Sequence, residues 1–306
     1  MNTFVVPFNI GYLSAETYEQ MLPAHYYGGI EDIDLVRDLL VRTLGEPPAT
    51  PSLRVLDLGC GAGRITRVLA PYARQLHGTD KSPGMIDRFR TEFPHAHALC
   101  ADTETVLADH HARGERYDLI GSFWSMSYPL LECFEDTTAN GVTVTNDLGT
   151  GTDRARRIVR NLVELLAPGG HLVMLFFDAY STEQQLVTRL WERVRPFPGT
   201  GRDHTWNLLL SGLRDAELQG HGSLTTQRLP GVAVADDPEA VRRWFLIGHL
   251  NALPRFLHDT DVIAEIDAFA AQHTAPDGRV LLPSGVNVVH FHATTDATRH
   301  LPAARP

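Results

Sequence analysis

The fold is decided by the stretch Val55-Leu56-Asp57-Leu58-Gly59-Cys60-Gly61-Ala62-Gly63-Arg64. The apolar run 53–58 is typical of a fully buried strand, and apolar residues at helical spacing follow over 65–73. Glycines at alternate positions between them allow the backbone to turn sharply and let a ligand approach where a Cβ would block it. The strand, loop and helix therefore predict a ligand site at the end of a buried strand.

Working outward from this loop, strands and helices alternate along the chain. We expect strands at 53–58, 75–79, 97–101, 117–123 and 171–177, and helices at 33–44, 65–73, 83–93 and 153–166. Later come helices at 238–250 and 261–273 and strands at 223–234, broken by Pro230-Gly231, and 285–294. Short apolar strands separated by helices imply an α/β fold, a Rossmann-like, mostly parallel sheet of seven strands with helices on both faces.

The same pattern divides the chain into four parts. Residues 1–35 form an irregular, tyrosine-rich segment that we interpret as a lid, with a surface-packed arm as the alternative, and 36–180 form the ligand-binding core. Residues 181–295 contain an insertion between strands five and six, followed by the last two strands, and act as the substrate-binding region. We expect 296–306 to be a disordered tail.

Composition restricts the partners. The 306-residue chain has a formal net charge of −10 and a pI of about 5.8, whereas nucleic-acid binding needs clustered Lys and Arg. No apolar run reaches the roughly 18 residues of a membrane span, and the first residues do not resemble a signal peptide. Three cysteines without a C-x-x-C pair indicate reduced thiols. We expect a cytoplasmic protein with a small-molecule partner and no nucleic-acid or membrane partner, with a homodimer as a candidate assembly.

An acidic residue, Asp80, ends the second predicted strand. A carboxylate at this point can accept two hydrogen bonds from the hydroxyls of a ribose. The alternative is that Asp80 caps the next helix, because Asp-x-Ser-Pro is a helix start signal. The arrival of the acid together with the glycines favours the ribose interpretation.

The run Asp57-x-Gly-x-Gly-x-Gly resembles the class I S-adenosylmethionine (SAM)-dependent methyltransferases. Further similar motifs follow in the same order over about 53–177: Asp80, Ala101-Asp102-Thr103, Ser122-Phe123 and the turn that begins at Leu166. In the dinucleotide fingerprint no acid is expected two residues before the first glycine, which disfavours an NAD-dependent oxidoreductase.

The resemblance implies SAM as cofactor and S-adenosylhomocysteine as product. It places the amino-acid part of SAM on the 59–63 backbone, the ribose on Asp80, and the adenine between Met85 and the Asp102 carboxylate. One of the N-terminal tyrosines would touch the carboxylate of SAM or the substrate. The cofactor-binding set is Asp57, Gly59, Cys60, Gly61, Gly63, Asp80, Lys81, Met85, Ala101, Asp102, Thr103, Ser122, Phe123, Tyr18 and Tyr27.

Methyl transfer from a sulfonium is an in-line displacement, so positioning and exclusion of water do much of the work. A general base is needed only where the nucleophile must lose a proton. The candidate catalytic residues are His249, Glu132 and Tyr128. The Asn/Asp-Pro-Pro-Tyr/Phe motif of amino-methylating relatives is absent after strand four, where Trp124 and Tyr128 stand instead. These rings indicate either stacking on a flat acceptor or ordinary core packing. The substrate-binding set is Trp124, Tyr128, Trp206 and Tyr26.

Several functions remain open at this point. The first is methyl transfer to a small aromatic acceptor in specialised metabolism, because the tyrosine-rich N-terminus is similar in character to that of indole C-methyltransferases. A second is methylation of a 2-oxo acid with a metal held by His290, His292 and a third ligand such as His249, although core packing is the default for histidines in a strand. The others are a macromolecular acceptor, disfavoured by the acidic charge, and a non-catalytic SAM-binding scaffold.

Overall fold

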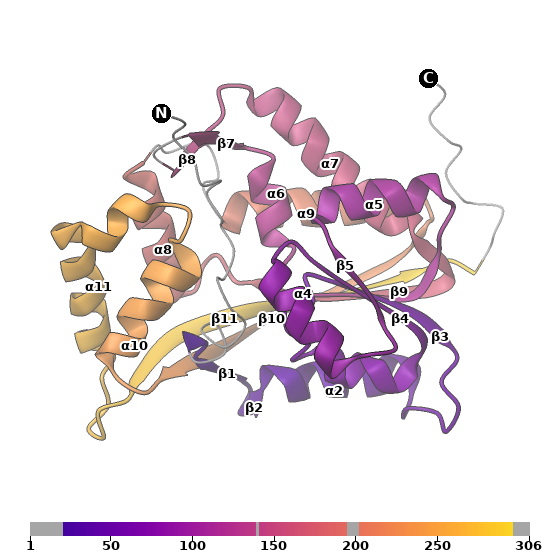
Figure 1. Ribbon diagram of the computed structural model, residues 1–306, viewed down its shortest axis with the longest axis horizontal. Helices are drawn as coiled ribbons and strands as arrows, with labels where there is room; N and C mark the ends of the chain where they lie inside the picture. The colour runs from indigo at the N-terminus through magenta and orange to yellow at the C-terminus, as the bar shows by residue number, and fades with distance from the viewer. Residues whose placement is uncertain (1–20, 139–140, 195–201, 296–306) are drawn as a thin grey trace.

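The computed structural model describes residues 21–138, 141–194 and 202–295, and Figure 1 shows their arrangement. Within these ranges the glycine-rich stretch begins on β3 (Leu53–Leu58), an inner strand of a nine-stranded sheet. The order across the sheet is β2-β1-β10-β11-β9-β6-β3-β4-β5. The remaining strands of the sheet are β1 (Ala24–Tyr27), β2 (Ile30–Glu31), β4 (Ala73–Asp80), β5 (His97–Cys100), β6 (Tyr117–Phe123), β9 (Leu166–Phe177), β10 (Gly222–Ala235) and β11 (Val280–Ala293).

The predicted α/β fold is confirmed. Strands β3, β4, β5, β6 and β9 are parallel, and β11 runs antiparallel to both β9 and β10. All seven predicted strands are present, in the order β5-β4-β3-β6-β9-β11-β10. Because the parallel strands end at one edge of the sheet, the loops that follow β3, β4, β5 and β6 meet there.

The predicted strand count is two too low, because an N-terminal hairpin extends the sheet. Strand β1 pairs with β10 from Ala24 opposite Val234 to Tyr27 opposite Gly231, so this part of the expected lid is sheet. The Gly28-Gly29 turn has φ of +61° and +88°, as a two-residue type I′ hairpin requires. Strand β10 also runs unbroken through Pro230. Proline is tolerated there because the pairing of β1 with β10 stops at Gly231.

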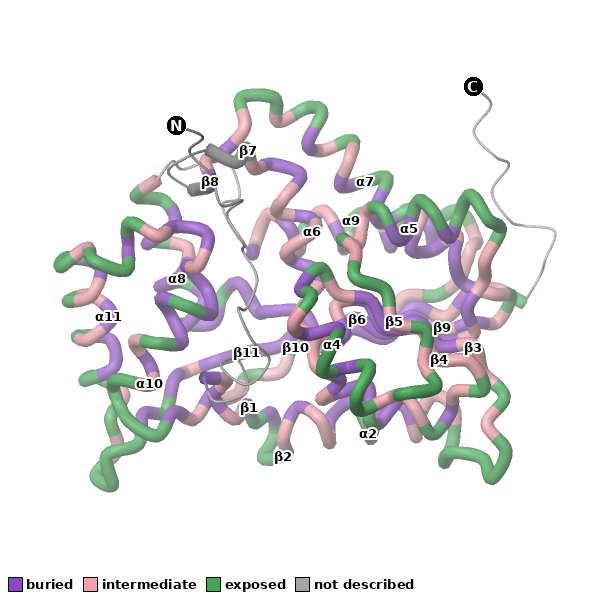
Figure 2. Tube along the Cα trace, viewed as in Figure 1, coloured by how far each residue is buried: buried purple, intermediate pink, exposed green. Residues whose placement is uncertain are grey.

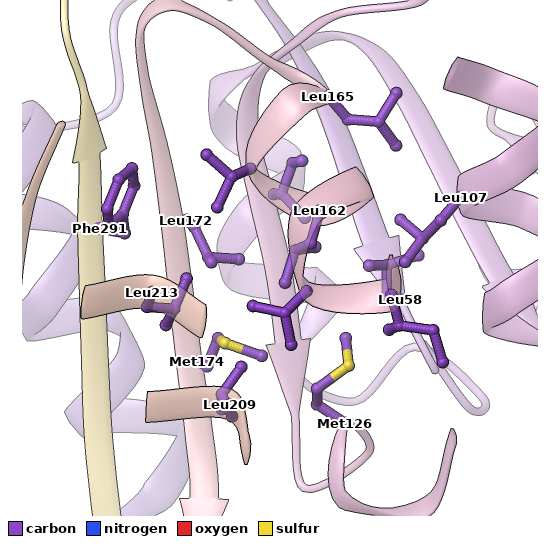
Figure 3. Packing of buried hydrophobic residues seen from close by; sticks show 14 of the residues in the cluster. Leu58, Leu107, Met126, Leu162, Leu165, Leu172, Met174, Leu209, Leu213 and Phe291 are labelled. Atoms are coloured by element: carbon purple, nitrogen blue, oxygen red, sulfur yellow. The ribbon is translucent and has the colours of Figure 1, made fainter. Parts of the chain in front are cut away.

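Helices cover both faces of the sheet, and strand residues alternate between them with period two. On one face α2 (Asp32–Leu44) and α3 (Thr66–Leu69) pack on residues such as Val173 and Leu175. On the other face α5 (Thr103–Ala112), α7 (Leu148–Glu164) and α9 (Arg202–Leu218) pack on Leu172 and Met174. Figure 3 shows this second layer, with Leu162, Leu209 and Leu213 against β9. A short turn η1 (Ala70–Tyr72) follows α3, and α4 (Pro83–Glu92) packs on β4 and β5.

A separate group of helices packs on the ends of β10 and β11 that extend past the parallel strands (Figure 1). It consists of α8 (Thr182–Glu192), α10 (Pro238–Arg243), the π-helical turn η2 (Trp244–His249), the 3-10 turn η3 (Pro254–His258) and α11 (Thr260–Gln272). The predicted insertion over 181–222 therefore consists of two helices that pack in different parts of the molecule. Helix α9 covers the sheet, whereas α8 belongs to this group. No helix in the described ranges is long and apolar enough to cross a membrane.

Several elements differ from the sequence-based expectation. Helix α7 begins at Leu148 rather than 153, because the Asp147 side chain caps it by accepting from the N–H of Thr150. The predicted helix 238–250 changes to π-helical geometry at Trp244. The sequence analysis missed α5, α6 (Ser127–Glu132) and the hairpin of β7 (Glu135–Thr138) and β8 (Gly141–Val144). These elements are short or polar, whereas the strongly predicted strands are the buried centre of the molecule (Figure 2).

Candidate cofactor cleft and second pocket

The glycines of the loop after β3 adopt conformations that other residues rarely reach. Gly59, Gly61 and Gly63 have φ of +70°, +55° and +95°. A Cβ on Gly59 would lie 2.3 Å from the Cβ of Ser125, whereas a Cβ on Gly61 would meet no atom within 4 Å. The N–H of Gly59 donates to the carbonyl of Thr79 at 2.8 Å, which ties the loop to β4. The loop thus leaves open space beside Gly61.

Asp80 organises this loop from the end of β4. Its Oδ2 accepts from the N–H of Gly61 at 3.0 Å, and its Oδ1 accepts from the N–H of Ser82 at 2.8 Å. Burial raises the pKa of Asp80, against the lowering effect of these two N–H groups. The cap of α4 is Ser82, whose Oγ accepts from the N–H of Met85. Asp80 is therefore not the helix cap, and each of its oxygens keeps capacity for a further hydrogen bond.

Asp57 lies beneath the loop rather than in contact with the open space. Its side chain is buried, and Oδ2 accepts from the hydroxyl of Thr66 at 2.6 Å. Burial raises the pKa of Asp57 to about 7, assisted by the charge of Asp80 and opposed by the Thr66 hydroxyl. Asp57 thus supports the loop from within the sheet.

A cleft opens above these residues at the carboxyl edge of the sheet and encloses about 1070 Å³, open solvent included. Residues from four consecutive strand ends line it, which is the convergence that the topology requires. From the predicted cofactor set it contains Gly59, Gly61, Asp80, Lys81, Met85, Asp102, Thr103 and Phe123. Residues that the sequence analysis did not select also line it: Leu22, His25, Ser82, Ser125, Pro129, Phe177, Trp244 and Asn251.

The rest of the predicted cofactor set lies outside the cleft wall. Asp57, Cys60, Gly63, Ala101, Ser122 and Tyr27 are not among the residues that line it. Tyr27 is buried because β1 is paired into the sheet, and Tyr18 lies outside the described residues. Asp102 does line the cleft, but its carboxylate also caps α5 by accepting from the N–H and hydroxyl of Thr105 at 2.9 and 2.8 Å. A contact of Asp102 with adenine stays a prediction.

Trp124, directly after β6, is held in an unusual backbone conformation. Its φ is +61°, which is rare for a bulky residue and costs energy that surrounding contacts must supply. Its ring N–H donates to Asp32 at 2.8 Å, and Arg64 donates to both oxygens of Asp32 at 2.7 and 2.5 Å. Its ring centroid lies 5.0 Å from that of Phe177. This arrangement joins α2, the glycine loop and the end of β6, and it fixes the Trp124 ring in the cleft wall.

A second pocket of about 520 Å³ adjoins the cleft. The two share Tyr128, Glu132 and Asn251 as lining residues. The second pocket is otherwise lined by residues of α6, β7, α8, α9 and the η2 region: Leu131, Glu135, Val187, Thr188, Trp191, Arg202, His249 and Ala252. Glu132, whose carboxylate pairs with Lys81, thus stands between the cleft and the second pocket.

His249 faces a buried carboxylate. Its Nε2 lies 3.5 Å from Oε1 of Glu183 on α8, and both side chains are fully buried. The indole N–H of Trp244 donates to the same oxygen at 2.7 Å. Burial opposes ionisation of Glu183, but the combined effect of His249, His25 and the indole N–H of Trp244 lowers the pKa of Glu183 to about 2. Burial lowers the pKa of His249, so its imidazole is neutral at neutral pH while Glu183 carries a charge.

The predicted substrate residues separate into two groups. Trp124 lines the cleft, and Tyr128 lines both the cleft and the second pocket. Trp206 instead packs on Phe176 in the core beneath α9, with ring centroids 5.5 Å apart. Tyr26 is 36% exposed on β1. Neither Trp206 nor Tyr26 lines either pocket. The position of Trp206 on α9 directs its ring into the core, and the pairing of β1 with β10 leaves Tyr26 away from the pockets.

The histidines of the metal hypothesis are not brought together. His290 lies on β11 with its Nε2 3.0 Å from Nδ1 of His171 on β9, and the ring of His292 stacks on His171 at 4.4 Å. His249 instead contacts Trp244 in the helical group. No three His, Cys, Asp or Glu side chains in the described ranges are placed to hold a metal ion.

The residues that sequence reasoning missed come from distant parts of the chain. His25 reaches the cleft through strand pairing, Phe177 ends the fifth parallel strand, and Arg202 begins α9. Only Phe177 has a local signal, since it is the last residue of a predicted strand. Glu183 could have been noticed as an acid that falls on a buried helical face beside Leu186 and Leu190.

Comparisons with known proteins agree with this geometry. Residues 56–172 match a family described as "Methyltransferase domain". Malonyl-[acyl-carrier protein] O-methyltransferase of Serratia marcescens is 29% identical over 39% of this chain and 47% of its own length. Nodulation protein S of Sinorhizobium fredii is 31% identical over 40% of this chain and 47% of its own length. The chain thus aligns with less than half the length of these curated relatives.

Among solved structures, the YcgJ protein of Bacillus subtilis is similar in fold. It has a TM-score of 0.50 and 14% identity, and the match covers 85% of this chain and 99% of that protein. The matched family segment includes the glycine loop, Asp80 and the strand ends that line the cleft. Residues 56–172 are therefore similar to a methyltransferase domain.

Proposed function

We propose that the chain transfers the methyl group of SAM to a small, aromatic, indole-like acceptor in specialised metabolism. The observation that carries this proposal is that the two cavities adjoin and share the lining residues Tyr128, Glu132 and Asn251. The glycine loop and Asp80 lie in the same cleft as Trp124, and Tyr128 leads from it into a second pocket. One side of the cleft suits a nucleoside and the other suits a flat acceptor.

The residues of the cleft fit SAM. Gly61 offers space that a side chain would fill, and Asp80 has remaining capacity to accept hydrogen bonds from a diol. Met85 and Phe123 supply apolar surface for a base. When bound, SAM supplies a methyl group that its own sulfonium charge already activates. The work left to the protein is to hold the acceptor in line and to exclude water.

Aromatic side chains favour a flat acceptor. His25, Trp124, Tyr128, Phe177 and Trp244 all line the cleft. Such rings stack on or edge against a planar ligand, and each such pair contributes about 0.5–1.5 kcal/mol beyond the burial of its area. The formal net charge of −10 also supports a small molecule over a nucleic acid as acceptor.

We assign the role of general base to His249, positioned by Glu183. A neutral imidazole on the wall of the second pocket can take a proton from an acidic N–H, O–H or C–H of the acceptor. The charged Glu183 would then stabilise the imidazolium that forms. Glu132 is a weaker candidate, because its carboxylate pairs with Lys81. Tyr128 forms part of the wall of both the cleft and the second pocket.

The test has two stages. Calorimetric titration with S-adenosylhomocysteine and with NAD examines the cofactor, and we expect micromolar binding of the first and none of the second. Incubation with SAM and a panel of indoles, followed by mass spectrometry, then seeks a product heavier by one methylene unit. Binding of S-adenosylhomocysteine without turnover of any aromatic compound would favour a non-catalytic scaffold, and binding of NAD would overturn the proposal.

A further inference from the structure

A buried arginine stands on the wall of the second pocket. Arg202, the first residue of α9, is only 4% exposed. Its guanidinium packs against two nearly perpendicular rings, with its carbon atom Cζ 4.4 Å from the ring centroid of Tyr128 and 4.4 Å from that of Phe177. Nη1 donates to the hydroxyl of Ser127 at 2.5 Å, and Nε donates to the side-chain oxygen of Gln184 at 3.3 Å. The head group is thus held in one orientation by neutral partners.

Arg202 forms no ion pair within 4.0 Å among the residues that the structure describes. The stretch 195–201 immediately before it contains no Asp or Glu. Nη2 makes no hydrogen bond within the described residues. It is not fully buried, so it can reach a ligand in the pocket. A buried cation without a counter-ion is unfavourable, so a group that could neutralise it from the pocket is expected.

Each acidic side chain around the second pocket either has another partner or is mostly neutral at pH 7. Glu132 pairs with Lys81. Burial and the charge of Glu132 raise the pKa of Glu135 to about 8, against the lowering effect of the charges of Lys81 and Arg202, so Glu135 is mostly neutral at pH 7. Glu183 is engaged by His249 and by the indole N–H of Trp244. The charge that the pocket presents to a ligand is therefore the positive charge of Arg202.

We propose that Arg202 binds a carboxylate of the acceptor, so that the substrate is an aromatic acid. A guanidinium offers a planar set of donors that matches a carboxylate better than any other side chain. Tyr128 borders both cavities, so an aromatic acid can lay its ring along the cleft while its carboxylate reaches Arg202. The carboxylate acts as the anchor that orients the ring, and the methyl group goes to another atom. This inference rests on the proposed function, because it needs the acceptor to lie in the same connected cavity.

The test compares acids with their neutral amides. The protein saturated with S-adenosylhomocysteine is titrated with three matched pairs: benzoate and benzamide, 3-phenylpropionate and 3-phenylpropionamide, and indole-3-propionate and indole-3-propionamide. We expect at least one acid to bind about tenfold more tightly than its amide, as a charged hydrogen bond provides. Arg202→Met should abolish that preference, and Arg202→Lys should keep part of it. Arg189→Met, which removes an exposed arginine of α8 that pairs with Glu265, should behave as the wild type.

The outcomes separate the two proposals. Failure of S-adenosylhomocysteine to bind the wild type would overturn the proposed function itself. Binding of S-adenosylhomocysteine with no acid preferred over its amide would overturn only the role of Arg202, as would an unchanged preference in folded Arg202→Met. If Arg202→Met does not fold, the decision rests on the wild-type preference and on Arg202→Lys. A purely structural arginine would alter the melting temperature and leave the ratio of acid to amide affinity unchanged.

Discussion

Asp80 contributes both to the shape of the glycine loop and to the hydrogen-bonding capacity of the cleft. Asp80→Asn keeps the size of the side chain and one oxygen but removes the charge. We expect the affinity for S-adenosylhomocysteine to weaken by about 1.5–3 kcal/mol, as the loss of a charged hydrogen bond usually costs. Calorimetry measures this affinity, with Asp87→Asn, at an exposed position of α4, as the control. Unchanged affinity in a folded Asp80→Asn protein would contradict the ribose assignment.

His249 and Glu183 make a second prediction at the level of single residues, in the pH dependence of turnover. Because burial lowers the pKa of His249 below its usual 6.5, kcat/KM should rise with pH along a limb that lies below pH 6.5. Glu183 raises the pKa of His249 against this burial, so Glu183→Gln should move the limb to lower pH.

The matching substitution is His249→Asn. It should lower kcat by roughly 10²–10⁴-fold, the usual contribution of a general base, with little change in the affinity for S-adenosylhomocysteine. Rates across pH 4–9 for the three proteins provide the measurement. An unaltered profile in Glu183→Gln would remove Glu183 from the mechanism.

Sequence reasoning found the side of the cleft that the ends of the parallel strands build and missed the side that depends on the packing of distant elements. Gly59, Asp80 and Trp124 each directly follow a recognisable strand, so their convergence follows from a parallel sheet. Arg202 and His25 reach the cavities only through the docking of α9 and the pairing of β1, which no local pattern encodes. Trp206 was misassigned for the same reason, since an aromatic residue on a helix gives no indication of which layer it will pack against.

At the level of elements, one carboxylate joins α2 to the two loops that shape the cleft. Asp32 has a 1% exposed side chain and binds both Arg64 and the indole N–H of Trp124. Asp32→Asn should lower the free energy of unfolding by about 1–3 kcal/mol, because it weakens three hydrogen bonds that the Asp32 carboxylate accepts. Asp34→Asn on the same helix is the matched control, since Asp34 pairs with Arg37 at an exposed site and should change stability by less than about 0.5 kcal/mol. Urea denaturation distinguishes them, and equal losses would refute the role of Asp32.

The lengths of strands β1 and β2 explain why the N-terminal region was predicted as irregular. Strand β1 has only four residues and β2 only two, too short for a periodic pattern to emerge. The local signal was the pair Gly28-Gly29, which is typical of a hairpin turn. The strands β3 and β6 were predicted with the observed bounds because their apolar runs are buried on both faces.

At the level of the whole molecule, the proposed function would divide cofactor binding and acceptor binding between different parts of one sheet. The parallel strands end at the glycine loop, while β10 and β11 extend further and carry the helices that contribute His249 and Glu183 (Figure 1). The cleft lies between these parts. Variation in the helical group can therefore change the acceptor without disturbing the cofactor loop, which follows from their separate hydrophobic clusters.

The stability of the whole fold should depend on pH through Asp57, which lies at its centre. The pKa of Asp57 is raised from 3.8 to about 7 in the folded protein, whereas the unfolded chain keeps the ordinary value. Between these values the unfolded state binds fewer protons, so the contribution is fully present below about pH 4. It declines as pH rises and is gone above about pH 7. Since one pKa unit corresponds to about 1.4 kcal/mol, the total is roughly 4–5 kcal/mol at most.

Asp57→Asn isolates this contribution, because a carboxamide does not titrate while its oxygen can still accept from Thr66. The difference in unfolding free energy between wild type and variant should change across pH 4–7 and stay constant above it. Urea denaturation at intervals of half a pH unit gives the two curves, and exposed Asp87→Asn supplies the control curve. Parallel curves for wild type and Asp57→Asn would mean that Asp57 is ionised in the folded protein at all these pH values. The loop would then rest on a buried charge, and Thr66→Val should become strongly destabilising at pH 7.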